Sequence, residues 1–222
     1  MKMWIFDGKH KLICGDSLNE EVWKELEGFD LVITDPPYKF EHDEWFDYVW
    51  KYGKEDLGVF VWGSDKMMVR LGMRYYDYFR YFLTVELISP QVFSSNIPIT
   101  AHDLIGYWNR GKNKFMNRKD GFTTHFKMMK RGKGGKRYIK DTKILKSLVL
   151  HYAGEDDVIL DCFAGSGSLL FVVESLNRQT VLFGENSRDN KVWLVEINEK
   201  LCRKIVENYK SRFGGKVEEV IV

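Results

Sequence analysis

Four consecutive residues, Asp35-Pro36-Pro37-Tyr38, directly follow a short apolar run at residues 29–34 and form a chemically specific group. The two prolines fix the backbone, so that the carbonyl of Pro36 points outward in one direction, and Asp35 adds a carboxylate acceptor beside it. These two acceptors can hold both hydrogens of an exocyclic amine, while the ring of Tyr38 stacks on the heterocycle that carries the amine. The simpler alternative is that the prolines end a strand and that the tyrosine caps it.

A second group lies in the segment from Asp161 to Ser168 (DCFAGSGS), where a Gly-x-Gly turn joins an expected strand to an expected helix. Such a turn lets the backbone approach a ligand closely and aims helix N–H groups at a carboxylate or phosphate. Glu196 ends the next expected strand, where a carboxylate can accept hydrogen bonds from ribose hydroxyls. The alternative for Glu196 is a surface carboxylate. A dinucleotide oxidoreductase could use this turn and Glu196, but it would leave residues 35–38 unexplained.

Each of these groups follows a buried strand, in a chain where short β-rich runs alternate with helical patterns. That alternation is typical of an α/β fold. Ser17 and Ser64 are expected helix N-caps, and the polar residues 184–190 are expected to form a hairpin between the short runs on either side. The expected strands cover residues 12–14, 29–34, 59–62, 81–88, 104–108, 158–160, 181–183 and 192–195, and the expected helices cover residues 17–27, 64–78, 142–151, 168–176 and 200–213.

The positive charge of the chain is concentrated in residues 110–140. This segment has twelve basic residues and a single acid, Asp120, so its formal charge is +11; because the whole chain carries +2, the remainder carries −9. Unpaired Lys and Arg in such a run favour contact with nucleic acid over a solvated surface loop. The segment has too few apolar residues for a core and is interpreted as a mobile insertion. The residues expected to contact nucleic acid are Lys112, Lys114, Arg118, Lys127, Lys130, Arg131, Lys133, Lys136 and Arg137.

The composition excludes several other classes of protein. At 222 residues, with 44% hydrophobic and 30% charged residues, the chain has the size and balance of one soluble globular domain. Its longest apolar runs, such as residues 169–173, are far too short to span a membrane, and its N-terminus has no signal-peptide pattern. Three widely spaced cysteines without a CxxC pair argue against a disulfide framework and a cysteine zinc site, so no metal is expected.

The two groups together resemble those of the S-adenosylmethionine-dependent DNA amino-methyltransferases. That family joins an Asp-Pro-Pro-Tyr motif to a Phe-x-Gly-x-Gly motif, which is present here as Phe163, Gly165 and Gly167. The tetrapeptide comes first, then the basic segment, then the glycine motif, and this order resembles the permuted β class. The resemblance implies an α/β, Rossmann-like methyltransferase fold, with a mostly parallel twisted sheet, helices on both faces and a circularly permuted motif order. It also implies one methyltransferase domain over residues 1–222, in which residues 110–140 act as a small target-recognition segment.

The resemblance assigns roles to individual residues. The expected catalytic residues are Asp35, Pro36, Pro37 and Tyr38. The expected cofactor contacts are Asp161, Phe163, Gly165, Ser166 and Gly167 of the glycine motif, together with Asp16, Lys143 and Glu196. Asp16 lies upstream of the catalytic strand, where the class has an acid that faces the adenine of S-adenosylmethionine. Lys143 opens the helix before the glycine motif, where the class usually has Lys-Pro, although Ile144 replaces the proline here.

The reaction implied by the resemblance is transfer of a methyl group from S-adenosylmethionine to N6 of an adenine flipped out of double-stranded DNA. Asp at the first position of the tetrapeptide favours adenine N6, whereas Ser is commoner for cytosine N4, so a cytosine-N4 enzyme is the alternative. An RNA adenine methyltransferase is less favoured, because such enzymes usually have Asn-Pro-Pro-Tyr and the unpermuted order. The chain has no Pro-Cys dipeptide, which argues against methylation of a cytosine ring carbon by a cysteine nucleophile.

Further expectations concern the setting of the reaction. A non-enzymatic nucleic-acid-binding relic would be expected to have decayed motifs, whereas both motifs are intact. The resemblance also implies a homodimer and a role in restriction–modification. The expected location is the cytoplasm, or the host cytoplasm if the source is viral.

Overall fold

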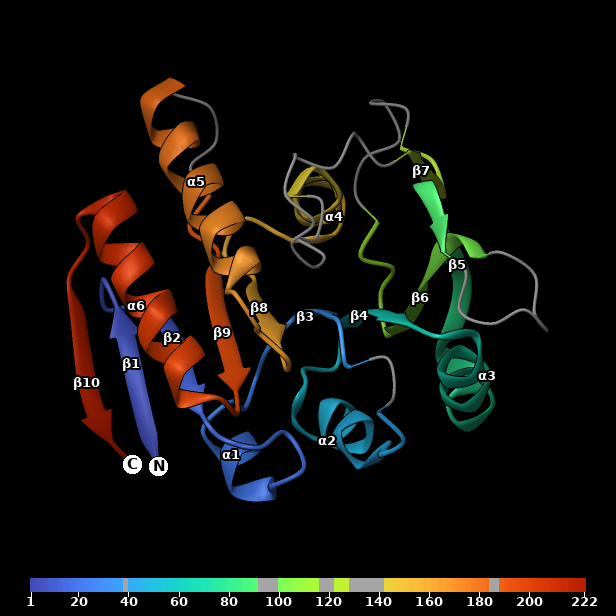
Figure 1. Ribbon diagram of the computed structural model, residues 1–222, viewed down its shortest axis with the longest axis horizontal. Coiled ribbons are helices and arrows are strands. Elements are labelled where there is room, and N and C mark those ends of the chain that lie inside the picture. Colours follow the sequence, from blue (N-terminus) through green and yellow to red (C-terminus); the bar gives the residue numbers. More distant parts are fainter. Residues whose placement is uncertain (38–39, 92–99, 116–121, 128–141, 184–187) are drawn as a thin grey trace.

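The computed structural model describes residues 1–37, 40–91, 100–115, 122–127, 142–183 and 188–222, and its frame is one continuous β-sheet (Figure 1). Within these residues the sheet has ten strands, in the order β10-β1-β2-β9-β8-β3-β4-β6-β5-β7. The strands are β1 (Lys2–Phe6), β2 (His10–Cys14), β3 (Leu31–Thr34), β4 (Leu57–Gly63), β5 (Phe79–Gln91), β6 (Thr100–Arg110), β7 (His125–Lys127), β8 (Val158–Asp161), β9 (Lys191–Glu196) and β10 (Val217–Ile221).

The central strands β2, β9, β8, β3 and β4 run parallel to one another. β1 and β10 add antiparallel pairings on one side, and β6 and β5 do so on the other. The expectation of a largely parallel α/β sheet is therefore confirmed for the centre, which carries both sequence motifs, while the flanks are mostly antiparallel. Parallel strands are buried on both faces, which explains the continuous apolar runs in β3 and β4.

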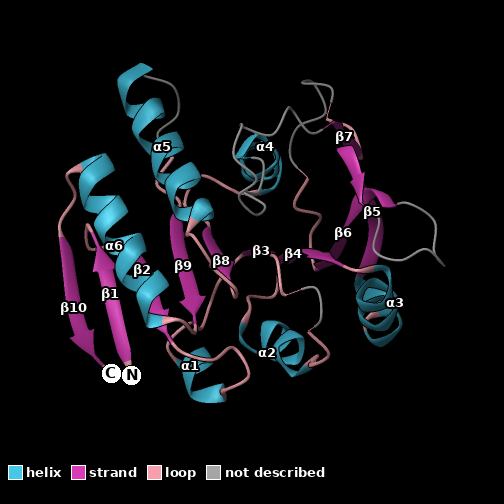
Figure 2. Cartoon of the chain, in the orientation of Figure 1, coloured by secondary structure: helices cyan, strands magenta, loops and turns pink. Residues whose placement is uncertain are grey.

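Helices cover both faces of the sheet, as expected (Figures 1 and 2). α1 (Glu20–Lys24), α2 (Glu44–Tyr52) and α3 (Asp65–Arg74) pack on one face, and α4 (Thr142–Tyr152), α5 (Ser168–Phe183) and α6 (Glu199–Phe213) pack on the other. Because side chains alternate along a strand, each central strand feeds two cores. In β3, Ile33 joins the core under α4, α5 and α6, whereas Val32 joins the other core with Trp23 and Trp45.

The predicted N-cap at Ser17 is wrong. The helix begins at Glu20, and the side chain of Asn19 caps it by accepting a hydrogen bond from the N–H of Glu21 (3.1 Å). The hydroxyl of Ser17 is buried and donates instead to the carbonyl of Cys162. Ser and Asn both favour N-cap positions, so residues 17–19 contain two candidates, and the long-range bond to Cys162 distinguishes them.

The predicted hairpin between residues 181–183 and 192–195 is also wrong. Residues 181–183 end α5, and β9 lies between β8 and β2, parallel to both. The short apolar run Val-Leu-Phe misled the prediction, because periodicity does not distinguish a short strand from the end of a helix. The helix that follows the glycine turn therefore runs to Phe183, beyond its predicted end at residue 176. The predicted helix over residues 64–78 likewise ends at Arg74 and is followed by a short 3-10 helix, Tyr76–Tyr78.

The described parts of the basic segment, residues 110–115 and 122–127, are tied to the rest of the fold. β7 pairs with β5 at one edge of the sheet, and Phe115, Phe122 and Phe126 pack against the core under α4. The low apolar content of the segment predicted a mobile insertion, but these three phenylalanines attach its described parts to the core. The rest of the predicted insertion, residues 116–121 and 128–140, lies outside the described residues.

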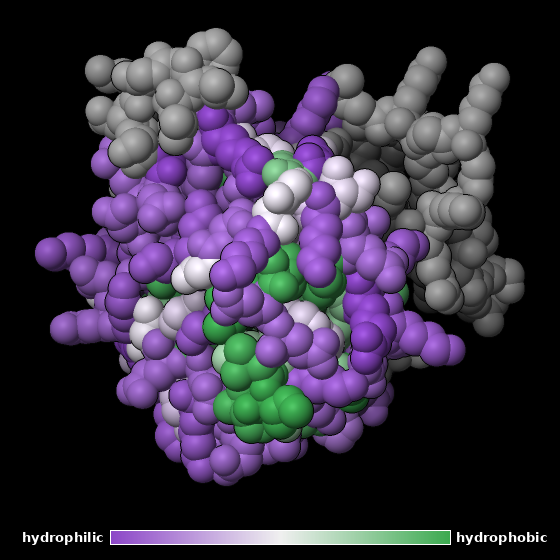
Figure 3. Space-filling model, turned by 90° about the vertical axis from the view of Figure 1, so that its left-hand side faces the viewer, coloured by the Kyte–Doolittle hydropathy of each residue, from purple (hydrophilic) through white to green (hydrophobic). Residues whose placement is uncertain are grey.

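β1 and β10, which the sequence patterns did not predict, bring the two ends of the described chain together. The N-terminal amine of Met1 donates to the carbonyl of Val222 (2.6 Å). The surface on this side of the molecule is largely hydrophilic, with apolar side chains gathered in the lower part of the view (Figure 3). No helix among the described residues is both long and apolar enough to cross a lipid bilayer.

Candidate active site at the carboxyl edge of the parallel strands

The carboxyl ends of neighbouring parallel strands bring the two sequence motifs to one edge of the sheet. Asp35 follows β3, Asp161 ends β8 and Glu196 ends β9. Asp16 lies just after β2, which pairs with β9. Because these strands run in the same direction, the residues that follow them meet at a common edge, where open α/β sheets bind their ligands.

A buried polar junction joins the two motifs directly. The hydroxyl of Thr34, the residue before Asp35, donates to Oδ1 of Asp161 (2.7 Å) and accepts from the backbone N–H of Cys162 (3.2 Å). The same Asp161 oxygen accepts from the N–H of Phe163 (3.1 Å). Thr34 and Asp161 are both buried, so these bonds are shielded from water and fix the start of the tetrapeptide against the start of the glycine motif.

Thr34 is a site residue that the sequence interpretation missed. The available signal was one hydroxyl at the end of an otherwise apolar strand, and a buried hydroxyl needs a hydrogen-bond partner. The sequence does not show which distant residue supplies that partner. Asp161, expected as a cofactor contact, uses at least one of its oxygens to hold the protein itself together.

The glycine motif adopts a backbone conformation that glycine permits. Gly165 (φ +53°) and Gly167 (φ +76°) both lie in the left-handed region. A Cβ on Gly167 would lie 3.0 Å from the side chain of Ile205, so this glycine lets α6 pack against the turn. Among the residues that the structure describes, a Cβ on Gly165 would meet only the Phe163 carbonyl oxygen, at 4.0 Å, so these residues leave space for a ligand to approach the Gly165 backbone.

Glu196 holds the glycine turn from the neighbouring strand. Its Oε2 accepts from the N–H of Gly165 (2.8 Å), and its Oε1 accepts from the N–H of Asn198 (2.8 Å). Glu196 is only 8% exposed. Burial raises the pKa of its carboxyl above the ordinary value, although the two backbone hydrogen bonds act in the opposite direction. Each carboxylate oxygen has a further lone pair, so Glu196 keeps capacity for hydroxyl donors.

The exposed members of the predicted cofactor set are Asp16, Ser166 and Lys143. Oδ1 of Asp16 accepts from the N–H of Leu18 (2.9 Å), and the preceding N–H, of Gly15, donates to the carbonyl of Glu196 (3.2 Å). Asp16 is therefore the neighbour, in the chain, of a residue that contacts the end of β9 directly. Within the described residues no group of three or more His, Cys, Asp or Glu side chains is placed to hold a metal ion.

The described part of the tetrapeptide runs from a half-buried to an exposed position. Asp35 is half-buried, Pro36 is buried and Pro37 is exposed. Among the described residues every peptide bond is trans. Tyr38, the predicted stacking residue, lies outside the described residues.

Aromatic rings form a second contact between the motifs. The ring of Phe40 meets the ring of Phe163 edge-on, with centroids 5.1 Å apart, and the ring of Trp45 meets Phe163 at 5.2 Å. Trp45 is fully buried. Phe163, the first residue of the Phe-x-Gly-x-Gly motif, is therefore packed between residues that follow the tetrapeptide.

Lys143 lies on the first turn of α4, beside the beginning of α5. It lines an open groove of 410 Å³ between α4, α5 and the end of α6. Ser168, the first residue of α5, lines the same groove, as do Lys146, Phe171 and Arg212. Lys143 thus lies near the helix that follows the glycine turn.

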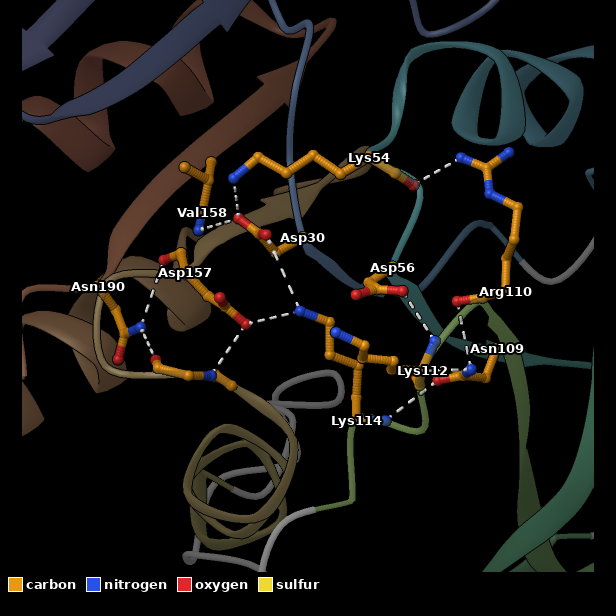
Figure 4. Close-up of polar contacts among 12 residues, drawn as sticks. Asp30, Lys54, Asp56, Asn109, Arg110, Lys112, Lys114, Asp157, Val158 and Asn190 are labelled. Atoms are coloured by element: carbon orange, nitrogen blue, oxygen red, sulfur yellow. Dashed lines mark hydrogen bonds and ion pairs between the residues drawn. The ribbon is translucent and has the colours of Figure 1, made fainter.

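Two of the residues predicted to bind nucleic acid lie at the opposite edge of the sheet (Figure 4). Nζ of Lys114 is 3.2 Å from Oδ2 of Asp157 and 3.8 Å from Oδ1 of Asp30. These acids directly precede β8 and β3, at the amino ends of the strands. The backbone N–H of Lys112 donates to Oδ1 of Asp56 (2.8 Å), just before β4. Among the predicted site residues that the structure describes, Lys112 and Lys114 therefore lie apart from the rest.

Lys127, by contrast, lies at the edge that carries the motifs. β4 and β5 both pair antiparallel with β6, and Leu104 of β6 faces both Gly63, the last residue of β4, and Thr84 of β5. β7 pairs in parallel with residues 84–86, so it begins level with the carboxyl end of β4. The other predicted contacts, Arg118, Lys130, Arg131, Lys133, Lys136 and Arg137, lie outside the described residues.

Several solved structures share this fold. M1.HpyAVI in complex with SAM has a TM-score of 0.70 at 14% identity, over 88% of this chain and 96% of that chain. The PvuII DNA methyltransferase, which is cytosine-N4-specific, has a TM-score of 0.66 at 15% identity, over 89% and 85%. TTHA0409 from Thermus thermophilus, complexed with S-adenosyl-L-methionine, has a TM-score of 0.64 at 14% identity, over 91% and 93%. These likenesses confirm the expected fold.

Sequence comparison extends from the fold to the family. No curated protein sequence matches the chain significantly. A family profile described as DNA methylase matches residues 29–207, a span that contains the tetrapeptide, the basic segment and the glycine motif. Because that match covers most of the chain, the protein belongs to the DNA methylase family.

Proposed function

We propose that the protein is an S-adenosylmethionine-dependent DNA methyltransferase that acts on exocyclic amino groups, with N6 of adenine as the acceptor. The observation that supports this most strongly is the bond between Thr34 and Asp161, because it holds the residue before Asp35 against the glycine motif. A donor site and an acceptor site on one rigid edge suit a direct transfer between two bound molecules. Membership of the DNA methylase family supports the same reaction.

The residues at this edge fit S-adenosylmethionine chemically. The open backbone at Gly165 admits close approach of a ligand, and Glu196 retains acceptor capacity for ribose hydroxyls. Asp16 is an exposed acceptor for the adenine amine, and Phe163 offers an apolar ring. Ser166, Gly167 and Lys143 complete the proposed contacts. M1.HpyAVI and TTHA0409 each hold this molecule in a related fold.

The proposed mechanism assigns the preparation of the amine to residues of the tetrapeptide. When bound, S-adenosylmethionine would supply a methyl group attached to a positively charged sulfur. In-line attack by the amine nitrogen would form the nitrogen–carbon bond as the carbon–sulfur bond breaks, and the sulfur would leave as a neutral thioether. The lone pair of that nitrogen is delocalised into the heterocycle and reacts poorly. Hydrogen bonds from the amine to Asp35 and to the Pro36 carbonyl favour a pyramidal nitrogen and free the lone pair. Asp35 accepts the proton that the nitrogen loses; it need not be a strong base, because the amine becomes acidic only as the methyl group arrives.

Positioning and electrostatics then account for most of the rate acceleration. The base leaves the duplex to reach this edge, and stacking on Tyr38 holds it there. Lys127, at the same edge, and the basic residues Arg118, Lys130, Arg131, Lys133, Lys136 and Arg137 are proposed to contact phosphates of double-stranded DNA. Lys112 and Lys114, at the opposite edge, are left out of this proposal.

Adenine is preferred over cytosine as the substrate because the tetrapeptide begins with Asp. Cytosine N4 is the alternative, and the cytosine-N4 specificity of the PvuII enzyme, which has the same fold, supports keeping it. A homodimer, a role in restriction–modification and a cytoplasmic location remain predictions from the resemblance.

The test is to identify the methylated nucleoside. The purified protein and S-adenosylmethionine are incubated with unmodified double-stranded DNA in one reaction and with RNA in another. The nucleic acid is then digested to nucleosides, which are analysed by mass spectrometry. We expect N6-methyladenine in DNA and none with the Asp35→Ala variant. Detection of N4-methylcytosine instead would show that the acceptor is cytosine N4 and not adenine N6. Methylated product in RNA alone would overturn the assignment of DNA as the substrate. No product in either polymer would contradict the proposed activity.

A further inference from the structure

The chain that leaves the tetrapeptide is held by a guanidinium group from α3. Arg70 donates from Nε to Oδ2 of Asp43 (3.1 Å) and from Nη2 to Oδ1 of Asp43 (3.0 Å), which makes a two-point contact with one carboxylate. The same Nη2 also donates to the carbonyl of Phe40 (3.2 Å). Arg70 therefore binds both ends of residues 40–43, the segment that leads from the tetrapeptide into α2.

Asp43 contributes its carboxylate to this contact and not to its own helix. It is the N-cap residue of α2, a position where Asp normally accepts from the first N–H groups of a helix, yet its side chain makes no capping hydrogen bond. The Asp43 side chain is 15% exposed and the Arg70 side chain 38%. A two-point, partly buried pair of this kind is directional and specific to arginine.

Phe40 links the Arg70 contact to both sequence motifs. Its N–H donates to the carbonyl of Pro37 (2.8 Å), which ties Phe40 directly to the second proline of the tetrapeptide. Its ring meets the ring of Phe163 in the glycine motif at 5.1 Å. A displacement of Phe40 would therefore reach the prolines and the glycine motif together.

We propose that Arg70 is a positioning residue for methyl transfer: by holding Phe40 and Asp43, it sets where the chain leaves Pro37 and thereby orients the acceptors of the tetrapeptide toward the glycine motif. The catalytic consequence of this inference rests on the proposed function. The positional claim rests on the contacts alone and is measured separately.

Arg74 provides a matched control. It lies one turn further along α3 and forms an ion pair with Asp47 of α2, and Tyr75 also contacts Asp47. Arg74 therefore joins the same two helices as Arg70 but touches neither Phe40 nor Asp43. An effect of Arg70 that arises only from joining α2 to α3 should also appear in Arg74→Gln.

The experiment compares Arg70→Gln, Arg70→Lys and Arg74→Gln with the wild-type protein by amide hydrogen exchange and by steady-state methylation of DNA. We expect exchange in peptides covering residues 35–43 to be at least about 10-fold faster in Arg70→Gln and unchanged in Arg74→Gln. We expect kcat to fall about 10- to 100-fold in Arg70→Gln, with KM for S-adenosylmethionine changed less than about threefold. Arg70→Lys should be intermediate, because an ammonium group cannot make the two-point contact.

Equal exchange in Arg70→Gln and Arg74→Gln would overturn the positional claim, whether or not methyl transfer is observed. Faster exchange with an unchanged kcat would overturn the catalytic consequence. If the wild-type protein methylates neither DNA nor RNA, the proposed function fails and the catalytic consequence with it, while hydrogen exchange still decides the positional claim. Asp43→Asn, which keeps the shape of the side chain and removes its charge, tests the same contact if Arg70→Gln does not fold.

Discussion

At the scale of single residues, the carboxylates of Asp161 and Glu196, at the ends of the neighbouring strands β8 and β9, have different surroundings. Asp161 accepts from the Thr34 hydroxyl and from the N–H of Phe163 inside the protein. Glu196 accepts from two backbone N–H groups and borders the open space at Gly165. Asp161 therefore holds the two motifs together, and Glu196 is the better placed of the two to bind a ligand.

Affinity for S-adenosylmethionine should depend on the ionisation of Glu196. Burial raises the pKa of this carboxyl, so on acidification it takes up a proton at a higher pH than an exposed Glu and then accepts hydrogen bonds less well. We expect affinity to fall as the pH drops through this pKa. Glu196→Gln should bind about 10-fold more weakly at neutral pH, as expected for a lost hydrogen bond to a charged group, and should lose the pH dependence. Calorimetric titration over the acidic range checks this; a pH profile shared by both proteins would refute it.

The two glycines of the turn should respond differently to alanine. In Gly167→Ala the new Cβ would lie 3.0 Å from Ile205 at a φ of +76°, so we expect the free energy of unfolding to fall by about 2–4 kcal/mol. In Gly165→Ala the space is open, so only the left-handed conformation costs about 1–2 kcal/mol, but affinity for S-adenosylmethionine should fall. Urea unfolding and calorimetry separate the two effects. Wild-type cofactor affinity in Gly165→Ala would be inconsistent with ligand approach at this backbone.

At the scale of elements, the site depends on the register between β3 and β8. The backbone register between these strands covers Leu31 with Ile159 and Val32 with Leu160. In that register Thr34 falls opposite Cys162, and the bond from the Cys162 N–H to the Thr34 hydroxyl continues it to the residue that precedes the tetrapeptide. The buried Thr34 hydroxyl therefore holds the start of the tetrapeptide in a fixed position relative to the end of β8.

Removing that hydroxyl should loosen the junction. In Thr34→Val the Asp161 carboxylate loses a donor and the Cys162 N–H loses its acceptor in a buried position. We expect the free energy of unfolding to fall by about 1–3 kcal/mol and methyl transfer to slow. Thr34→Ser, which keeps the hydroxyl, should stay close to wild type in both respects. Chemical denaturation and a methylation assay provide the measurements, and equal stability of the Val and Ser variants would count against the junction.

At the scale of the whole molecule, the basic segment divides between two edges of the sheet. Its beginning is anchored at the amino ends of the strands through Lys114, Asp30 and Asp157 (Figure 4). Lys127, in β7, lies at the carboxyl edge with the motifs. Lys114 therefore pairs with acids of the fold itself, whereas Lys127 is proposed to contact DNA.

Replacing Lys114 and Lys127 one at a time should separate an effect on stability from an effect on DNA binding. Lys114→Ala should lower the free energy of unfolding by about 1 kcal/mol or more, because it removes the ion-pair partner of the partly buried Asp157, and should leave DNA affinity unchanged. Asp30 keeps its ion pair with Lys54 in this variant. Lys127→Ala should weaken DNA binding and reduce the slope of log affinity against log salt by about 0.9 for one lost phosphate contact. Binding titrations at several salt concentrations decide between the roles. Equal losses of DNA affinity in both variants would contradict the division between edges.

The sequence allowed prediction of the centre of the fold and of both motifs for a physical reason. Buried parallel strands give continuous apolar runs, and at β3 and β8 the functional residues begin where the run ends. The parts that could not be predicted depend on distant partners. Ser17 bonds to Cys162, Thr34 to Asp161 and Lys114 to Asp157. In each case the sequence displays a polar group but not the residue that the fold places against it.

The most direct test of a single methyl-transfer site is single-turnover methylation of DNA by the Asp35→Asn variant, with S-adenosylmethionine bound beforehand and its dissociation constant measured on the same sample. We expect the dissociation constant to stay within about threefold of the wild-type value, because Asp35 is proposed to contact the acceptor amine and not the cofactor. We expect the transfer rate to fall at least about 100-fold, because one preorganised acceptor is weakened. A wild-type transfer rate in this variant, with the same bound cofactor, would contradict the role of the tetrapeptide in catalysis.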